Sequence, residues 1–248
     1  MAVDNRLWAH ALVISAQIDK DTYRDVVLSF SRVEFKTATG NSTLPTQPTT
    51  DRPGLCILYS LFGGSGKTGV LDYFAGLEGG AESSLSGWRE ILALIVANKT
   101  PGDTSAISAL GDQLQSHGMT SAAHVCYLLS LNHSPLTGID GQNAKFVLLG
   151  GNHMYNYSRF LKDPMALFMT EVFEFAQSQI GGLGIAGGLP HLQALKLSHA
   201  HWLAELGFVA EATQYCDAIE QLVKNYSKGS PYFHKTFIDA LKDLSERL

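Results

Sequence analysis

GWREILALIVANKTPGDTSAISALGDQLQSHGMTSAAHVCYLLSLN, residues 87–132, contains three helix patterns separated by residues that stop helices. In the first pattern the apolar residues recur at i, i+3, i+4 and i+7, the spacing of one helical face: Trp88, Ile91, Leu92 and Ile95. Pro101 and Gly102 end this helix, and Asp103 is expected to cap the next one.

The second and third patterns complete this stretch. The second carries the stripe Ile107, Leu110 and Leu114 and ends at Gly118, which suits the left-handed position after a helix. The third begins at Met119, and its expected buried stripe is Ala122, Val125, Cys126 and Leu129. The stretch therefore predicts a helical hairpin that stacks on its neighbours.

The same order of residues returns near the C-terminus, in LAELGFVAEATQYCDAI at 203–219. Gly118, Met119 and Ala123 correspond to Gly207, Phe208 and Ala212, and Leu114 corresponds to Leu203. The two copies are otherwise dissimilar. They favour stacked helical pairs more than they favour an exact repeat.

Helical spacing continues through most of the chain. An N-terminal helix is expected over residues 5–18, with Leu7, Ala11, Ile14 and Ile18 on its buried side. Asp163-Pro164 predicts the start of a helix that runs to Ile180. That helix has two adjacent apolar stripes, so we expect it to be enclosed between neighbours on two sides. The apolar run KFVLL at 145–149 fits a buried strand or part of a helix.

These patterns predict an all-α fold, a solenoid or stack of helices. We expect one α-helical domain over residues 1–248, with variable polar or glycine-rich loops near 36–53, 63–86 and 181–189.

Composition excludes several classes of function. The 248 residues are 45% apolar and 17% charged, which is enough apolar material for a substantial core. The net charge of −5, without a basic run, argues against binding to nucleic acid or to an anionic membrane surface. No apolar run approaches the ~20 residues of a membrane span, so we expect no direct membrane insertion. The three cysteines, Cys56, Cys126 and Cys216, are expected to be reduced core thiols of an intracellular protein.

The segment GGSGKT at 63–68 resembles a phosphate-binding loop. That motif needs a glycine at the position of Leu61, a strand before it and a helix after it. Here a helical stripe precedes the segment and Gly69 follows Thr68. We interpret GGSGKT as a solvated loop. A nucleotide hydrolase that uses this segment is the least favoured of three hypotheses for the function; the other two are given below.

No other group of residues predicts a catalytic, cofactor or metal site. His199 and His201 are two positions apart on a helix and point in different directions, and the same holds for His124 and Cys126. Glu171 and Glu174 share a helical face, which we interpret as solvated. The sequence offers no nucleophile elbow and no metal-ligand spacing. We expect no enzyme activity and no cofactor.

Several blocks, in this order, closely resemble the central domain of the Sec-sixteen family, scaffold proteins of endoplasmic-reticulum (ER) exit sites. They extend over nearly the whole chain: Arg6-Leu7-Trp8, His10-Ala11-Leu12, Trp88-Arg89, Leu92-Ala93, Asn98, Leu110-Gly111-Asp112, AHVCYL at 123–128, LGGNH at 149–153, LAELG at 203–207 and YCDAI at 215–219.

The resemblance implies an ancestral coatomer element, a helical stack folded back on itself. In the family this element pairs with a propeller subunit of the COPII cage through a β-rich segment that donates a blade. No strand-rich segment precedes Arg6, and the chain is similar to the C-terminal part of the element. The resemblance also implies a location in the cytoplasm, peripheral to the ER membrane at exit sites.

We therefore expect a non-enzymatic scaffold module that helps to organise COPII coat assembly in ER-to-Golgi transport. The alternative is a peptide-binding adaptor of the tetratricopeptide type, although no period of about 34 residues exists. Self-association and the partner-binding surface are left open. Asn152 and His153 are expected to fix the loop after Leu149 rather than to bind a partner.

Overall fold

The computed structural model describes residues 7–34, 53–75, 87–130, 144–153, 163–180, 188–226 and 230–248. These ranges contain α-helices, one short 3₁₀ helix and no β-strand. The chain divides into two compact units, residues 1–133 and 134–248. The prediction of one domain over residues 1–248 stays a prediction.

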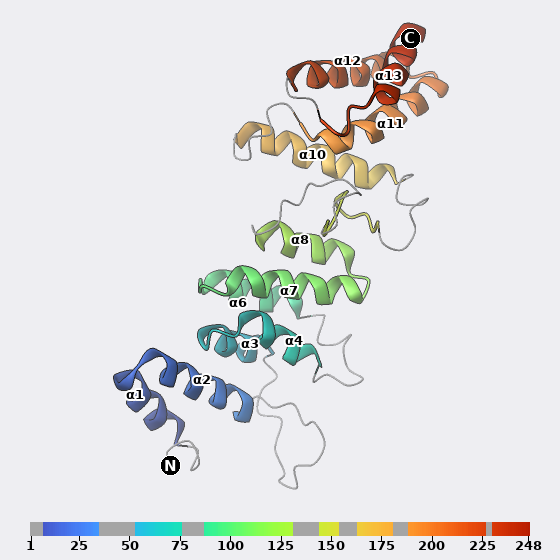
Figure 1. Ribbon diagram of the computed structural model, residues 1–248. Coiled ribbons are helices and arrows are strands. Elements are labelled where there is room, and N and C mark those ends of the chain that lie inside the picture. Colours follow the sequence, from blue (N-terminus) through green and yellow to red (C-terminus); the bar gives the residue numbers. More distant parts are fainter. Residues whose placement is uncertain are drawn as a thin grey trace. The chain divides into compact units, whose positions relative to one another are not determined.

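The first unit is a series of packed helices (Figure 1). In chain order they are α1 (Trp8–Ile18), α2 (Lys20–Glu34), α3 (Pro53–Phe62), α4 (Gly66–Ala75), α6 (Trp88–Ala97), α7 (Asp103–Ser116) and α8 (Thr120–Ser130). Helices α1 and α2 pack together, α2 contacts α3, α3 and α4 contact α6 and α7, and α8 lies on α7. The stack that the sequence predicts is present in this unit.

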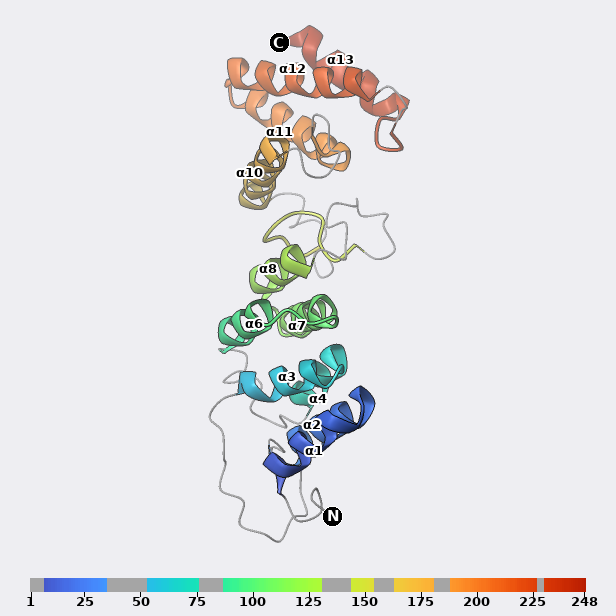
Figure 2. The same cartoon turned by 90° about the vertical axis from the view of Figure 1, so that its left-hand side faces the viewer.

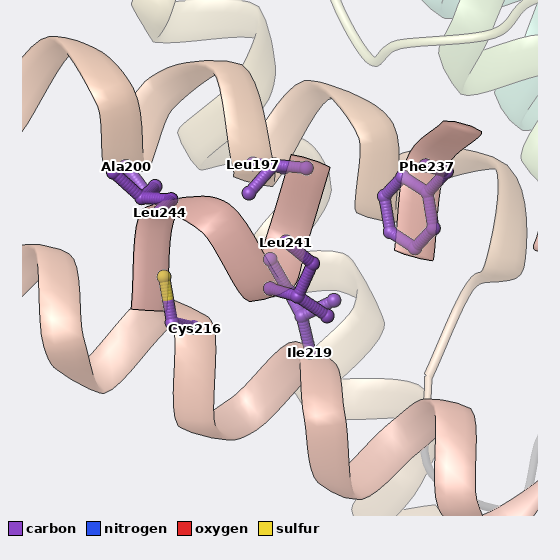
Figure 3. Close-up of a cluster of buried hydrophobic side chains, with 7 residues drawn as sticks. All are labelled: Leu197, Ala200, Cys216, Ile219, Phe237, Leu241 and Leu244. Atoms are coloured by element: carbon purple, nitrogen blue, oxygen red, sulfur yellow. The ribbon is translucent and has the colours of Figure 1, made fainter. Parts of the chain in front are cut away.

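The second unit is built from α10 (Pro164–Ile180), the 3₁₀ helix η1 (Pro190–Leu192), α11 (Gln193–Glu205), α12 (Val209–Asn225) and α13 (Lys235–Arg247). Helices α11 and α12 lie side by side, and α13 packs against both (Figure 2). Figure 3 shows the apolar core between these three helices, which consists of Leu197, Ala200, Cys216, Ile219, Phe237, Leu241 and Leu244.

Helices α6, α7 and α8 largely match the three patterns predicted for residues 87–132. All four residues of the α6 stripe are buried, and so are Ile107, Leu110 and Leu114 on α7. Two details are wrong. Helix α7 begins at Asp103 with Gly102 as its N-cap, so Asp103 is a first-turn acid rather than the cap. On α8, Ala122 and Cys126 are buried, whereas Val125 and Leu129 are exposed.

The buried face predicted for α1 is correct at Ala11 and wrong at its other three positions. Ala11 and Ser15 are buried, while Leu7, Ile14 and Ile18 are exposed. The helix turns a different face to its neighbour α2, where the rings of Trp8 and Phe30 meet edge to face at 5.5 Å.

The KFVLL segment is neither strand nor helix. Residues 144–153 form turns and bends, yet Phe146, Val147, Leu148 and Leu149 are all buried. Thr170 of α10 holds this segment, because its hydroxyl oxygen accepts the Leu149 N–H at 2.9 Å. Within the second unit, Val147 and Leu148 form a core cluster with Ala166, Leu167, Leu189 and Leu192.

Candidate functional site

The glycine-rich segment at 63–68 forms a helix–turn–helix corner. Helix α3 precedes it, as expected, but α4 begins at Gly66, so residues 66–75 are helix rather than the predicted loop. Gly64 has φ +75°, its N–H donates to the Leu61 carbonyl at 2.9 Å, and the Ser65 N–H donates to the Ser60 carbonyl at 2.9 Å. This is the Schellman arrangement that ends many helices.

The two hairpin turns that the sequence pairs have the same geometry. Gly118 and Gly207 have φ of +78° and +88°. The N–H of the following residue, Met119 or Phe208, donates to Leu114 or Leu203 at 2.9 Å in each case. The correspondence of these turns is confirmed, and the corner at Gly64 is a third copy of them.

The residue five positions after each turn glycine is small, and in the copy at Gly64 it is Gly69, directly after GGSGKT. Gly69 stands where Ala123 and Ala212 stand in the other copies, and those two alanines are fully buried. A Cβ built on Gly69 would lie 2.3 Å from the Ser60 Cβ, and one on Gly66 would lie 2.6 Å from the Gly102 carbonyl oxygen. These glycines allow helices and turns to pack closely.

We expect Lys67→Ala to leave the free energy of unfolding unchanged within about 0.5 kcal/mol, because Lys67 is exposed on the first turn of α4. Thermal melts of the wild type and the variant, with and without ATP, check this. ATP-dependent stabilisation of the wild type that the variant loses would contradict our interpretation of the segment.

The carboxylates of Glu171 and Glu174 do not form a solvated face, which corrects the sequence interpretation. Glu174 is only 9% exposed, and one oxygen accepts the backbone N–H of Leu189 at 2.6 Å. Its other oxygen forms an ion pair with Lys196 of α11, and Lys196 Nζ also lies 3.8 Å from Glu171. The Lys196 ammonium group is therefore the counter-charge of both carboxylates.

Burial raises the pKa of Glu171, although Lys196 and the Tyr215 hydroxyl, which donates to Glu171 at 3.1 Å, act in the opposite direction. Tyr215 belongs to α12, so the cluster ties α10 to both α11 and α12. This arrangement holds both carboxylates in fixed structural contacts rather than leaving one as a general base and the other as an acid.

The packing residues among these histidines and cysteines are His124, His199, Cys126 and Cys216. The side chain of Cys56 lies outside the described part of the structure. His199 lies between the rings of Phe168 and Tyr215, each at a centroid distance of 5.3 Å. His124 and Cys126 are both buried on α8, and burial raises the pKa of Cys126 to about 12. Cys216 is likewise a buried free thiol. Among the described residues, no three His, Cys, Asp or Glu side chains are placed to hold a metal ion.

Within the second unit, helix α10 is buried on one side only. Its buried face consists of Ala166, Leu167, Thr170 and Glu174. The opposite side carries large exposed apolar residues: Met165, Phe168, Met169, Val172, Phe175 and Ile180. A contiguous apolar surface of this kind marks many protein–protein contact sites. The signal in the sequence is the wide apolar arc, but helical periodicity alone places such an arc in the core.

The comparison with protein families decides where this chain belongs. The family model described as "Sec16 Sec23-binding domain" matches residues 1–248. The chain belongs to the Sec16 family. The resemblance inferred from the sequence is thereby confirmed.

Curated Sec16 proteins match the whole chain. "COPII coat assembly protein SEC16" of Phaeosphaeria nodorum is 37% identical over 262 residues, and its counterpart in Aspergillus terreus is 37% identical over 263 residues. In both cases the match covers 100% of this chain and 14% of the relative. The chain thus spans about one seventh of the length of these relatives.

A solved structure confirms the fold. A chain of the "Sec13/Sec16 complex, S. cerevisiae" superimposes with a TM-score of 0.70 at 16% identity, covering 99% of this chain and 60% of that chain. The all-α fold of the ancestral coatomer element type is confirmed by this likeness.

Two of the blocks that carry the Sec16 resemblance contribute to a core cluster and to a turn. Cys216 and Ile219 from YCDAI belong to the core in Figure 3. In LGGNH, Gly150 has φ +78°, and His153 forms a hydrogen bond with the backbone of Ala144. That bond supports the loop-fixing role expected of His153.

Proposed function

We propose that this chain is a non-enzymatic scaffold module of COPII coat assembly, and that it works at the surface of the ER membrane at exit sites. The observation that carries the proposal is the Sec16 family match over residues 1–248, together with relatives named COPII coat assembly proteins. None of the helices in the described ranges has the length and apolarity needed to cross a bilayer.

The proposed partners are COPII coat proteins. The family description names Sec23, and the structural relative is part of a complex with Sec13. The test is direct binding of the purified chain to recombinant fungal Sec23 and Sec13, measured by isothermal titration calorimetry. Binding to Sec23 is the expected result, and absence of binding to both proteins would contradict the proposal for this chain.

The exposed apolar face of α10 supports a scaffold role, because it offers an apolar surface to a partner. The opposite side of the helix, which includes Glu174, packs inside the second unit. A carboxylate placed in the middle of this face would have to be desolvated in any contact with a partner. We expect Val172→Asp to weaken binding to Sec23 by about tenfold or more. Val172 is 69% exposed, so the free energy of unfolding should change by no more than about 0.5 kcal/mol.

The matched control is Val13→Asp on α1, where the valine is 66% exposed. Both variants add the same charge to an exposed helical position, so any effect of net charge alone appears in both. Equal losses of binding would show that the α10 face is not the contact. Loss of binding accompanied by a lower melting temperature in Val172→Asp alone would point to a folding defect.

A further inference from the structure

A cavity of about 210 Å³ opens between the start of α10 and one face of α11, from Leu195 to Trp202. Its volume is below the roughly 300–1,000 Å³ of pockets that hold a drug-sized ligand, so it suits a single side chain. Its floor is apolar and is formed by Leu148, Leu167 and Leu195. Asp163, Ser198 and Trp202 line the same cavity.

The described lining of this cavity contributes one carboxylate, that of Asp163. One oxygen of Asp163 accepts the N–H groups of Met165 at 3.0 Å and Ala166 at 3.4 Å, which fixes the carboxylate at the start of α10. The helix N-terminus adds an opposing partial charge of about +0.5, less than the full charge of the carboxylate. Among the described residues that line the cavity there is no lysine or arginine. The cavity therefore favours a cation over an anion.

The wall of the cavity suits a flat cation. Trp202 is 51% exposed, and an exposed indole face attracts guanidinium groups, which stack on it. The Ser198 hydroxyl donates to the Ala194 carbonyl at 3.0 Å, which leaves its oxygen able to accept. His199, also in the wall, is held by the ring contacts described above. The site is preformed.

We propose that this cavity binds one arginine side chain from a partner protein. The methylene groups lie on the three leucines, and the guanidinium pairs with Asp163 and stacks on Trp202. Arginine fits better than an apolar side chain, because an apolar group would cover the Asp163 carboxylate without pairing it. This proposal does not depend on the identity of the coat partner, because its test uses a defined small probe.

The test uses the full chain labelled with fluorotryptophan and observed by fluorine NMR. The chain has three tryptophans, and Trp202→Phe assigns the resonance of interest. Titration with N-acetyl-arginine amide is expected to shift the Trp202 resonance in a saturable way and to leave Trp8 and Trp88 unchanged. N-acetyl-citrulline amide, similar in shape but uncharged, is expected to give no shift.

Asp163→Asn removes the charge and keeps a residue that caps helices well, so the fold is retained. We expect it to weaken binding of the arginine probe about tenfold. The control is Asp19→Asn, because Asp19 caps α2 by accepting the Thr22 N–H at 2.8 Å and lies in the other unit. Unchanged affinity in Asp163→Asn, or equal shifts with citrulline, would overturn the proposal. A Trp202 resonance that moves with protein concentration alone would overturn it too, because a second copy would then fill the cavity.

Discussion

Lys196→Met is expected to lower the free energy of unfolding by about 3–5 kcal/mol, the usual cost of removing one partner from a buried ion pair. The side chains of Lys196, Glu171 and Glu174 are 15%, 20% and 10% exposed. The methionine replaces the stem of the lysine but leaves two carboxylates without a counter-charge. Urea denaturation at neutral pH measures the change.

Lys224→Met is the matched control. Lys224 also pairs with a glutamate, Glu220 at 3.2 Å, but its side chain is 73% exposed, and such pairs contribute about 0–1 kcal/mol. If Lys196→Met lowers the free energy of unfolding as little as Lys224→Met does, the carboxylates of α10 are solvated, as the sequence alone suggests.

The pH dependence of Lys196→Met gives a second measurement. Burial already raises the pKa of Glu171, and Lys196 opposes that rise, so its removal raises the pKa further. A carboxyl whose folded-state pKa lies above the unfolded value of about 4.3 favours folding most below that value, and the advantage is lost as the pH rises through the folded-state pKa. The gap in stability between the variant and the wild type should therefore narrow as the pH falls from 7 towards 5.

The features that the sequence predicts correctly are local ones. The turns at Gly118 and Gly207 depend on hydrogen bonds between residues three and five apart and on a left-handed glycine, all of which neighbouring residues specify. Asp163 and Pro164 likewise mark the start of α10, and the Asp163 carboxylate caps it. The third copy of the turn, at Gly64, was missed because GGSGKT also resembles a phosphate-binding loop.

The misprediction of the α10 face depends on residues distant in the chain. Helix α10 has a wide apolar arc, and periodicity alone places that arc in the core. Instead its polar residues face inward, because Leu189 and Lys196, 15 and 22 positions away, satisfy Glu174. With Glu174 facing inward, the apolar arc of α10 is left on the exposed side. No pattern within α10 reveals which partners are available.

Thr170 holds the irregular segment 144–153, so we expect its substitution to lower the free energy of unfolding. Thr170 is fully buried, and its hydroxyl donates to the Ala166 carbonyl at 2.7 Å while accepting the Leu149 N–H. Thr170→Val keeps the shape of the side chain but leaves the buried Leu149 N–H without this acceptor. A buried donor left without a partner costs about 1–3 kcal/mol, and we expect a loss of this size in urea denaturation.

Thr213→Val on α12 is the control that isolates the long-range bond. The Thr213 hydroxyl makes the same kind of bond to a carbonyl four residues earlier, that of Val209 at 2.9 Å, but its side chain is exposed. The change of helix propensity from threonine to valine is the same at both positions and is small. We expect Thr213→Val to stay within about 0.5 kcal/mol of the wild type. Hydrogen exchange at the Leu149 amide should accelerate only in Thr170→Val. Equal stability of the two variants would show that the segment is held by its buried apolar residues, Phe146 to Leu149, without help from Thr170.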